Sequence, residues 1–329
     1  MTEVRPLLEV RDMRISIPTQ RGIVHAVNGI SYQVNRGEVM GIIGESGSGK
    51  SVSSYAVMHL MKKNFRVDGG QVLFDGEDIL ALSDEKMQPY RGGKISMIFQ
   101  DPLSCLDPVY TIGRQLTETV LAHEKVTKEA AEQRAVNMLK AVGLRDAEQM
   151  MNRYSFEISG GMRQRVMIAI ALICDPELLI ADEPTTALDV TVQDQILRLL
   201  RTLVREKHMS MVFITHNFSV AAQICDSVSV MYGGYILEQG PIRQIFSDPV
   251  HPYTQAILRA MPRMEAEPGE RLMPIEGEPI DPIHMPSGCP FHPRCTHAMD
   301  ICRERFPDMT EITNQHRAYC HLLKEGDHE

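Results

Sequence analysis

The stretch that most constrains this chain is "GESGSGKS", residues 44–51. It matches the pattern G-x-x-x-x-G-K-[ST], follows the apolar run "EVMGII" and opens a helical stretch, "KSVSSYAVMHLMKK". Glycines at these positions let backbone N–H groups turn inward around phosphate oxygens, and the helix start adds partial positive charge. A strand buried on both faces, followed by such a loop and a helix, predicts a parallel α/β sheet that binds a nucleotide phosphate.

The segments around this loop agree with an α/β fold. Two further apolar strands, "PELLIADEP" and "MSMVFITHN", lie on either side of the helical stretch "VTVQDQILRLLRTLVREKH". Strands that alternate with helices predict a mostly parallel sheet. The opening segments "LLEVRDMRISI" and "GIVHAVNGISYQV" alternate apolar and polar residues, which predicts an antiparallel β subdomain. Residues 116–142 have helical spacing without Gly or Pro, which predicts helical structure over this range.

Composition and charge narrow the class of protein. The 329 residues are 43% hydrophobic, which suits one large domain with an extension or two domains. The net charge of −9 argues against nucleic acid as a partner, because surfaces that bind phosphate backbones are usually basic. The longest apolar run, residues 166–174, has about half of the length that spans a bilayer. The N-terminus has no apolar signal region, so we expect a cytoplasmic chain that reaches a membrane through a partner.

Two acidic residues end the strand in "LLIADEP". Ligands of parallel sheets bind beyond the carboxyl ends of the strands, which places Asp182 to hold Mg²⁺ through water and Glu183 to orient and polarise an attacking water. In the glycine-rich loop, Lys50 reaches the outer phosphates and the Ser51 hydroxyl ligates Mg²⁺. Phosphoryl transfer depends on metal, positioned water and charge stabilisation, so this set predicts nucleotide hydrolysis. The alternative is that the acidic residues only cap the next helix.

A second anion site is expected in "SFEISGGMRQRVMIAIAL", where Ser159, Gly160 and Gly161 precede a helical run. One chain cannot easily aim this site and the glycine-rich loop at the same nucleotide. Two chains arranged head to tail can do so.

The motifs "GESGSGKS", "MIFQDP", "ISGGMRQR", "LLIADEPTTALD" and "FITHN" occur once each, in this order, and together resemble the ATP-binding cassette (ABC) superfamily. The resemblance implies an α/β fold of the P-loop NTPase class with an ABC-type ATP-binding domain over residues 1–250. It also implies a mostly parallel sheet, an antiparallel β subdomain and a helical subdomain over about residues 103–160. In the implied sandwich dimer, two ATP molecules lie between the Walker A loop of one subunit and the Ser-Gly-Gly of the other.

The resemblance also implies roles for individual residues. Glu183 would be the catalytic carboxylate, and His216 would act with it by contacting the γ-phosphate. Gln100 would sense Mg²⁺ and connect to the transport subunit, and Asp189 would lie in the loop that crosses to the opposite site. The residues expected to bind ATP are Gly44, Glu45, Ser46, Gly47, Ser48, Gly49, Lys50, Ser51, Gln100, Ser159, Gly160, Gly161 and Asp189. Those expected to bind Mg²⁺ are Ser51, Gln100 and Asp182.

Some positions depart from the family pattern. Ile158 and Met162 replace the Leu and Gln of the signature, and we expect little effect from either. Asn217 follows His216 where Asp is common, so we expect a weaker local contact there. No aromatic residue for stacking on adenine is evident over residues 17–25.

After Asp248 the chain becomes rich in proline, and we expect a C-terminal extension over residues 251–329. Its segments "HPYTQAILRAMP" and "GCPFHPRC" resemble the oligopeptide, dipeptide and nickel branch of the ABC importers. In that branch the tail is an accessory element on the ATPase core.

The tail contains the spacing C-x₅-C-x₆-C-x₁₇-C, formed by Cys289, Cys295, Cys302 and Cys320. Four thiolates can complete a Cys₄ zinc site or hold a [4Fe–4S] cluster. Paired zinc ligands are usually separated by about two to four residues, and the gaps here are longer. The resemblance also implies an iron–sulfur cluster. We therefore predict a cluster with a structural role, with zinc as the alternative and no metal as a third interpretation.

The function that the resemblance implies is ATP hydrolysis that powers uptake of di- or oligopeptides. The chain would lie peripherally on the cytoplasmic face of the inner membrane. Its partners would be a second homologous ATPase subunit, in a heterodimer, two transmembrane permease subunits and an extracytoplasmic substrate-binding protein.

Three alternatives stay open. One is an importer of nickel or another small solute, and another is a soluble ABC ATPase that acts on ribosomes or DNA. The acidic charge and the lack of a second cassette or coiled-coil insertion argue against the latter. The third is a metal-stabilised interaction module with an inactive ATPase. The intact residues that oppose it are Lys50, Asp182, Glu183 and His216.

Overall fold

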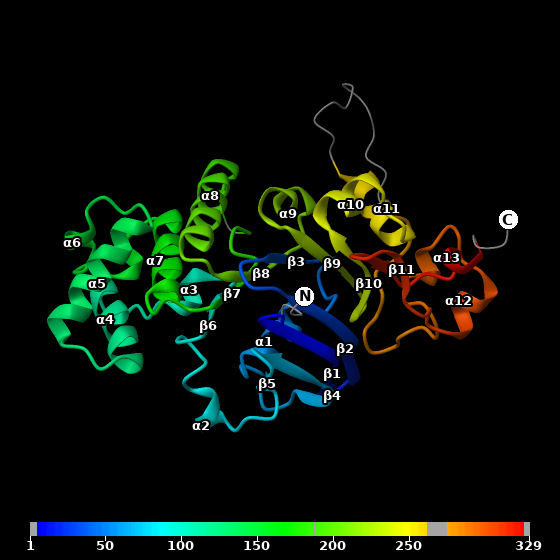
Figure 1. Ribbon diagram of the computed structural model, residues 1–329, viewed down its shortest axis with the longest axis horizontal. Coiled ribbons are helices and arrows are strands. Elements are labelled where there is room, and N and C mark those ends of the chain that lie inside the picture. The colour runs from blue at the N-terminus through cyan, green and yellow to red at the C-terminus, as the bar shows by residue number, and fades with distance from the viewer. Residues whose placement is uncertain (1–4, 187, 262–274, 326–329) are drawn as a thin grey trace. The chain divides into compact units, whose positions relative to one another are not determined.

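The computed structural model describes residues 5–186, 188–261 and 275–325 of the chain (Figure 1). The chain divides into two compact units, and each of them is discontinuous in sequence. The first comprises Met1–Leu7, Val34–Val39 and Ala81–Ile214, and the second comprises Leu8–Gln33, Met40–Leu80 and Thr215–Glu329.

The first unit contains a parallel sheet in the order β8-β7-β6. The strands are β6 (Ile95–Ile98), β7 (Leu178–Asp182) and β8 (Ser210–Thr215). Every residue of the three strands is buried, as expected for strands covered on both faces. The prediction of parallel strands from the apolar runs is confirmed here.

Helices make up most of the rest of this unit, and α4, α5 and α7 pack against one another (Figure 1). Its helices are α2 (Asp84–Met87), α3 (Pro102–Cys105), α4 (Ile112–His123), α5 (Lys128–Ala141), α6 (Ala147–Met150), η1 (Ser155–Glu157), α7 (Gly160–Leu172) and α8 (Val190–Glu206). The helical pattern predicted over residues 116–142 is confirmed, and it forms two helices with a break between α4 and α5. The Thr127 hydroxyl accepts a hydrogen bond from the Ala130 N–H and starts α5 afresh.

The second unit contains an antiparallel sheet in the order β2-β1-β4-β5. Its strands are β1 (Leu8–Thr19), β2 (Gly22–Val34), β4 (Arg66–Phe74) and β5 (Glu77–Asp78). The alternating pattern of the opening segments therefore predicted this β subdomain correctly.

A second set of strands in this unit has the order β11-β12-β10-β9-β3, and the glycine-rich loop follows β3. The strands are β3 (Val39–Ile43), β9 (Ser227–Tyr232), β10 (Tyr235–Pro241), β11 (Thr310–Thr313) and β12 (His316–Ala318). The helices of the unit are α1 (Lys50–Val57), α9 (Phe218–Ile224), α10 (Ile242–Ser247), α11 (Pro252–Ala260), η2 (His292–Arg294), α12 (Asp300–Glu304) and α13 (Leu322–Glu325). Strand β12 pairs with β10, so part of the proline-rich tail is hydrogen-bonded to the same set of strands as β3, which precedes the glycine-rich loop.

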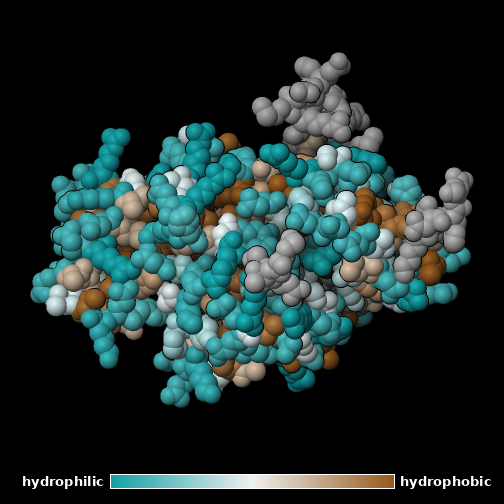
Figure 2. Space-filling view, viewed as in Figure 1, coloured by the Kyte–Doolittle hydropathy of each residue, from teal (hydrophilic) through white to brown (hydrophobic). Residues whose placement is uncertain are grey.

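The face shown in Figure 2 is largely hydrophilic, with hydrophobic residues in scattered patches. Over the described parts of the chain, none of the helices combines the length and the apolar character needed to cross a membrane.

Candidate functional site

The glycine-rich loop runs from the end of β3 to the start of α1. Gly49 has a φ of 98°, and a Cβ there would lie 2.1 Å from the carbonyl oxygen of Ala26. A Cβ at Gly44 would lie 2.0 Å from the carbonyl oxygen of Met231. Only glycine fits at these two positions, since a side chain would collide with backbone atoms.

Lys50 lies inside the curve of this loop. Its Nζ donates hydrogen bonds to the carbonyl oxygens of Gly44 at 2.8 Å and Glu45 at 2.9 Å. The side chain is almost completely buried, and the next residue, Ser51, is half-buried at the start of α1. The ammonium group therefore lies against the backbone that is expected to surround the phosphates.

His216 and the loop line one hollow of about 400 Å³. The hollow is lined by Gly44, Glu45, Ser46, His216, Ile257, Ala260, Ile275 and Arg294. The last four of these residues were not singled out in the sequence. They come from α11 and from the tail, and no local pattern connects them with the loop.

Glu45 is anchored by two residues of the C-terminal region. Its backbone N–H donates to the Tyr253 hydroxyl at 3.2 Å. Its carboxylate accepts hydrogen bonds from Arg294 at 2.8 and 3.4 Å. The second residue of the loop is thus held at both its backbone and its side chain.

The acidic strand end lies in the first unit. Asp182 is the fully buried last residue of β7, and Glu183 follows it with a φ of 46°. The Glu183 carboxylate accepts hydrogen bonds from Gln100 Nε2 at 3.1 Å and from Thr186 Oγ1 at 2.8 Å. The structure therefore brings Gln100 and Glu183 together.

The helix after this strand, α8, is capped by Asp189, whose Oδ1 accepts a hydrogen bond from the Val192 N–H at 2.9 Å. The alternative that Asp182 or Glu183 caps this helix is therefore wrong.

Ser159 caps α7, and its Oγ accepts a hydrogen bond from the Met162 N–H at 3.3 Å. Gly160 and Gly161 form the first turn, and a Cβ at Gly161 would lie 3.0 Å from Val192 of α8. The exposed Ser159 and the exposed Asp189 thus both stand at helix N-termini of the first unit.

All four tail cysteines line one small cavity, together with His251 and Phe291. Burial raises the pKa of Cys289 to about 12 and that of Cys320 to about 11. Among the described residues, no group of three or more His, Cys, Asp or Glu side chains is arranged to hold a metal ion. The expected metal centre therefore stays a prediction.

His251 was not singled out in the sequence. Its Nδ1 accepts a hydrogen bond from the Tyr253 N–H at 3.0 Å, and its buried Nε2 has no hydrogen-bond partner. Burial lowers the pKa of His251 to about 3, so the ring beside the cysteines is neutral.

Glu238 of β10 is a second buried group that the sequence did not reveal. Its carboxylate accepts hydrogen bonds from the N–H groups of Val250 and His251 and lies 2.8 Å from His316 Nε2. One carboxylate therefore joins β10, the start of α11 and strand β12.

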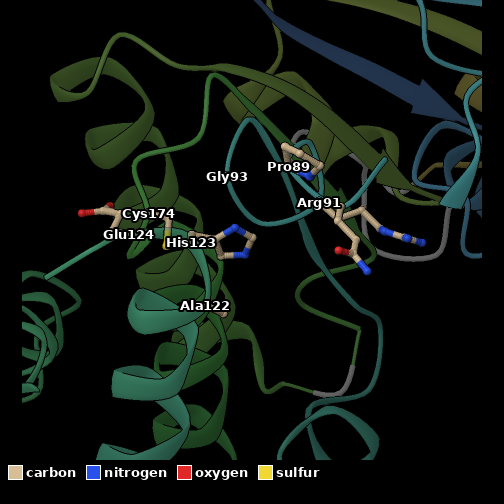
Figure 3. A pocket seen from close by; sticks show the side chains of 8 residues that line it. Pro89, Arg91, Gly93, Ala122, His123, Glu124 and Cys174 are labelled. Carbon is tan, nitrogen blue, oxygen red and sulfur yellow. The ribbon is translucent and has the colours of Figure 1, made fainter. Parts of the chain in front are cut away.

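A separate hollow of about 610 Å³ lies in the first unit (Figure 3). The His123 ring at the end of α4 lies against a glycine turn, since a Cβ at Gly92 would be 2.6 Å from His123 Nε2. In Figure 3 the Glu124 side chain points away from this ring. We therefore assign no chemistry to this hollow.

Comparisons with known proteins add independent findings. Residues 27–186 match a family described as "ABC transporter", and residues 237–302 match one described as "Oligopeptide/dipeptide transporter, C-terminal region". The chain is 48% identical to the oligopeptide transport ATP-binding protein OppD of Escherichia coli strain K12, over 93% of this chain and 90% of that protein. It is 44% identical to the dipeptide transport ATP-binding protein DppD of Bacillus subtilis strain 168, over 96% of this chain and 94% of that protein.

Among solved structures, the chain is similar to the dimeric ATP-binding cassette MJ0796 in a post-hydrolysis state bound to ADP and Pi. The TM-score is 0.65 and the identity 27%, over 72% of this chain and 99% of that chain. The similarity thus extends over nearly the whole of a solved cassette.

Proposed function

Because this chain belongs to the ABC transporter ATP-binding proteins, in their oligopeptide/dipeptide branch, we propose that it hydrolyses ATP to power peptide uptake by an ABC importer. The observation that carries this proposal is the similarity to OppD and DppD along nearly the full length, with the C-terminal region included. The net charge of −9 disfavours an ATPase that acts on ribosomes or DNA, because surfaces that bind phosphate backbones are usually basic.

We assign the ATP site to the residues predicted from the motifs. Mg²⁺ would be held by Ser51, Gln100 and Asp182, and would neutralise charge on the phosphates. The loop supplies backbone N–H groups, and the buried Lys50 supplies a positive charge beside them. His216 lines the same hollow as the loop, which supports its assignment to the γ-phosphate.

Glu183 is the group that we assign to water activation. Its carboxylate accepts hydrogen bonds from Gln100 and Thr186, which orient the side chain. A carboxylate at this position can accept a hydrogen bond from water and hold the oxygen in line for attack.

We further propose a head-to-tail dimer with a second homologous ATPase subunit. Ser159 and the two glycines at the start of α7 would serve ATP held on the partner's loop. The similarity to a cassette solved as a dimer supports this arrangement. Two permease subunits and an extracytoplasmic binding protein would complete an importer, with this chain peripheral on the cytoplasmic face of the inner membrane.

Within this assembly, residues 1–250 would form the ATP-binding domain, with a helical subdomain over about 103–160. Residues 251–329 would form an accessory region whose Cys289, Cys295, Cys302 and Cys320 hold a [4Fe–4S] cluster. A tetrahedral zinc site draws its four sulfurs to within about 3.8 Å of one another, as Zn–S bonds of about 2.3 Å require. In a [4Fe–4S] cluster each thiolate ligates its own iron. The observation that supports one shared centre is that all four thiols line the same small cavity.

Co-purification followed by uptake tests this proposal. The tagged chain should isolate with membrane permease subunits, and disruption of its gene should abolish uptake of a labelled tripeptide while nickel uptake persists. Co-isolation of ribosomes or DNA, or loss of nickel uptake alone, would overturn the assignment.

A further inference from the structure

We propose that Arg294 is a positioning residue for the phosphate-binding loop, and that through it the cysteine-bearing segment sets the affinity for ATP. The proposal rests on the proposed ATP site. It goes beyond that site because it connects residues 249 positions apart in the chain.

Arg294 is held in a single orientation. Its two Nη atoms donate to the two carboxylate oxygens of Glu45, and Nη1 also donates to the Tyr232 hydroxyl at 3.3 Å. Its Nε donates to the backbone carbonyl of Glu276, and Nη2 also donates to that of Ile275. The side chain is only 5% exposed, so this is a paired and largely desolvated arginine rather than a surface charge.

The charge of Glu45 explains why the loop needs such a partner. A carboxylate in a loop that surrounds a polyphosphate repels the ligand, and the repulsion is strong where water is excluded. Arg294 neutralises this carboxylate and fixes its direction. The carbonyl oxygen of Glu45 also accepts a hydrogen bond from Lys50 Nζ. A shift of Glu45 therefore also displaces the Lys50 ammonium group.

Arg294 belongs to the cysteine segment. It is the last residue of η2 and directly precedes Cys295. The same segment places the Phe291 ring 5.2 Å from the Tyr253 ring, whose hydroxyl accepts the Glu45 N–H. A change in the packing around Cys295 therefore reaches Glu45 through both the arginine and the tyrosine.

Calorimetric titration of ATP into the full chain tests the role of Arg294. Arg294→Met leaves a carboxylate unpaired beside the phosphates and should weaken binding about tenfold, since breaking a desolvated charge pair is costly. Arg294→Lys keeps the positive charge but loses the two-pronged hydrogen bonding to the Glu45 carboxylate. Its affinity for ATP should lie between those of Arg294→Met and wild type. The matched control, Arg305→Met, removes an arginine whose side chain is 61% exposed, and its affinity should be that of wild type.

The decisive variant is the double substitution Glu45→Gln with Arg294→Met. It has no unpaired carboxylate, so it should recover most of the lost ATP affinity even where its melting temperature stays as low as that of Arg294→Met. A purely structural role predicts a double variant that binds no better than the single one. That result, or wild-type affinity in Arg294→Met, would overturn the proposal.

The connection to the cysteines is tested with Cys295→Ser. This substitution should weaken ATP binding in the wild-type background and have a clearly smaller effect in the double variant, where only the contact through Tyr253 remains. Equal losses in both backgrounds would show that the effect does not pass through Arg294. If the wild-type chain itself binds no ATP, the proposed ATP site fails, which is distinct from a failure of this inference.

Discussion

Glu183, the proposed catalytic carboxylate, has a backbone conformation that few residues other than glycine adopt. Its φ of 46° is a left-handed value, which costs about 1–3 kcal/mol and persists only where the surroundings enforce it. Here the Glu183 N–H donates to the carbonyl of Ile214 at 3.0 Å, and the carboxylate is bound by Gln100 and Thr186. The strain is therefore used to present one side chain at the end of β7.

Substitution Glu183→Gln should leave ATP affinity within about twofold of wild type and lower turnover at least about a hundredfold, the usual contribution of a general base. The amide keeps the shape of the side chain but is a poor proton acceptor. The measurement is phosphate release by a complex whose partner site is already disabled. Hydrolysis at the wild-type rate in that complex would refute the assignment.

The site residues that we proposed from the sequence belong to contiguous motifs. The loop glycines, Lys50 and Glu183 follow from local spacing, because each is placed by a strand that ends beside it. Arg294 and Tyr253 could not be predicted, since they reach Glu45 only through tertiary packing. The sequence pattern gives no sign that Glu238 differs from an exposed polar residue of a strand, yet its side chain is fully buried.

Among the elements, Glu238 connects β10, α11 and β12. Replacing it with Ala leaves the N–H groups of Val250 and His251 and the ring of His316 without their acceptor. Buried pairs that lose one partner cost about 3–5 kcal/mol, so Glu238→Ala should lower the free energy of unfolding by about 3 kcal/mol or more. Chemical denaturation measures this value. The exposed Glu311 of β11 is the control, and equal effects of Glu238→Ala and Glu311→Ala would contradict the role of Glu238.

A second prediction concerns the four tail cysteines that line one cavity. If Cys289, Cys295, Cys302 and Cys320 hold one cluster, Ser at any one of them should have the same effect as Ser at all four, because no three can complete the site. After anaerobic purification the wild-type chain should contain about four irons and four sulfides, and each variant should lose them and become protease-sensitive in its tail.

The exposed Cys105 provides the control for this series, and Cys105→Ser should keep its iron. One zinc per chain would favour the alternative metal. Absence of both metals, with four freely alkylated thiols in the folded chain, would rule out a metal centre.

The elements themselves were predicted where they are long and periodic. The strands β3, β7 and β8 and the antiparallel β subdomain followed from apolar runs and alternation. The break at Thr127 was missed because a polar cap lies within an otherwise regular helical pattern. Strands β11 and β12 were missed because they are short and are formed by pairing with a strand far away in sequence.

For the whole molecule, the placement of Ser159 predicts that activity depends on a second subunit. The purified chain alone should hydrolyse ATP slowly, and addition of its partner ATPase and permeases should raise the rate, since each Ser-Gly-Gly would serve the nucleotide of the opposite chain. Hydrolysis assays across protein concentrations, with the oligomeric state measured in parallel, test this dependence. Full activity from a strict monomer would contradict the sandwich dimer.

The most direct test of the central claim is peptide transport by the reconstituted importer. Proteoliposomes would contain the permeases and both ATPase subunits, with the binding protein and a labelled tripeptide outside and Mg-ATP trapped inside. We predict accumulation of the tripeptide that requires trapped ATP and is abolished by Glu183→Gln in this chain. Accumulation that proceeds equally without ATP, or that is unchanged by Glu183→Gln, would contradict the claim that this chain powers peptide uptake.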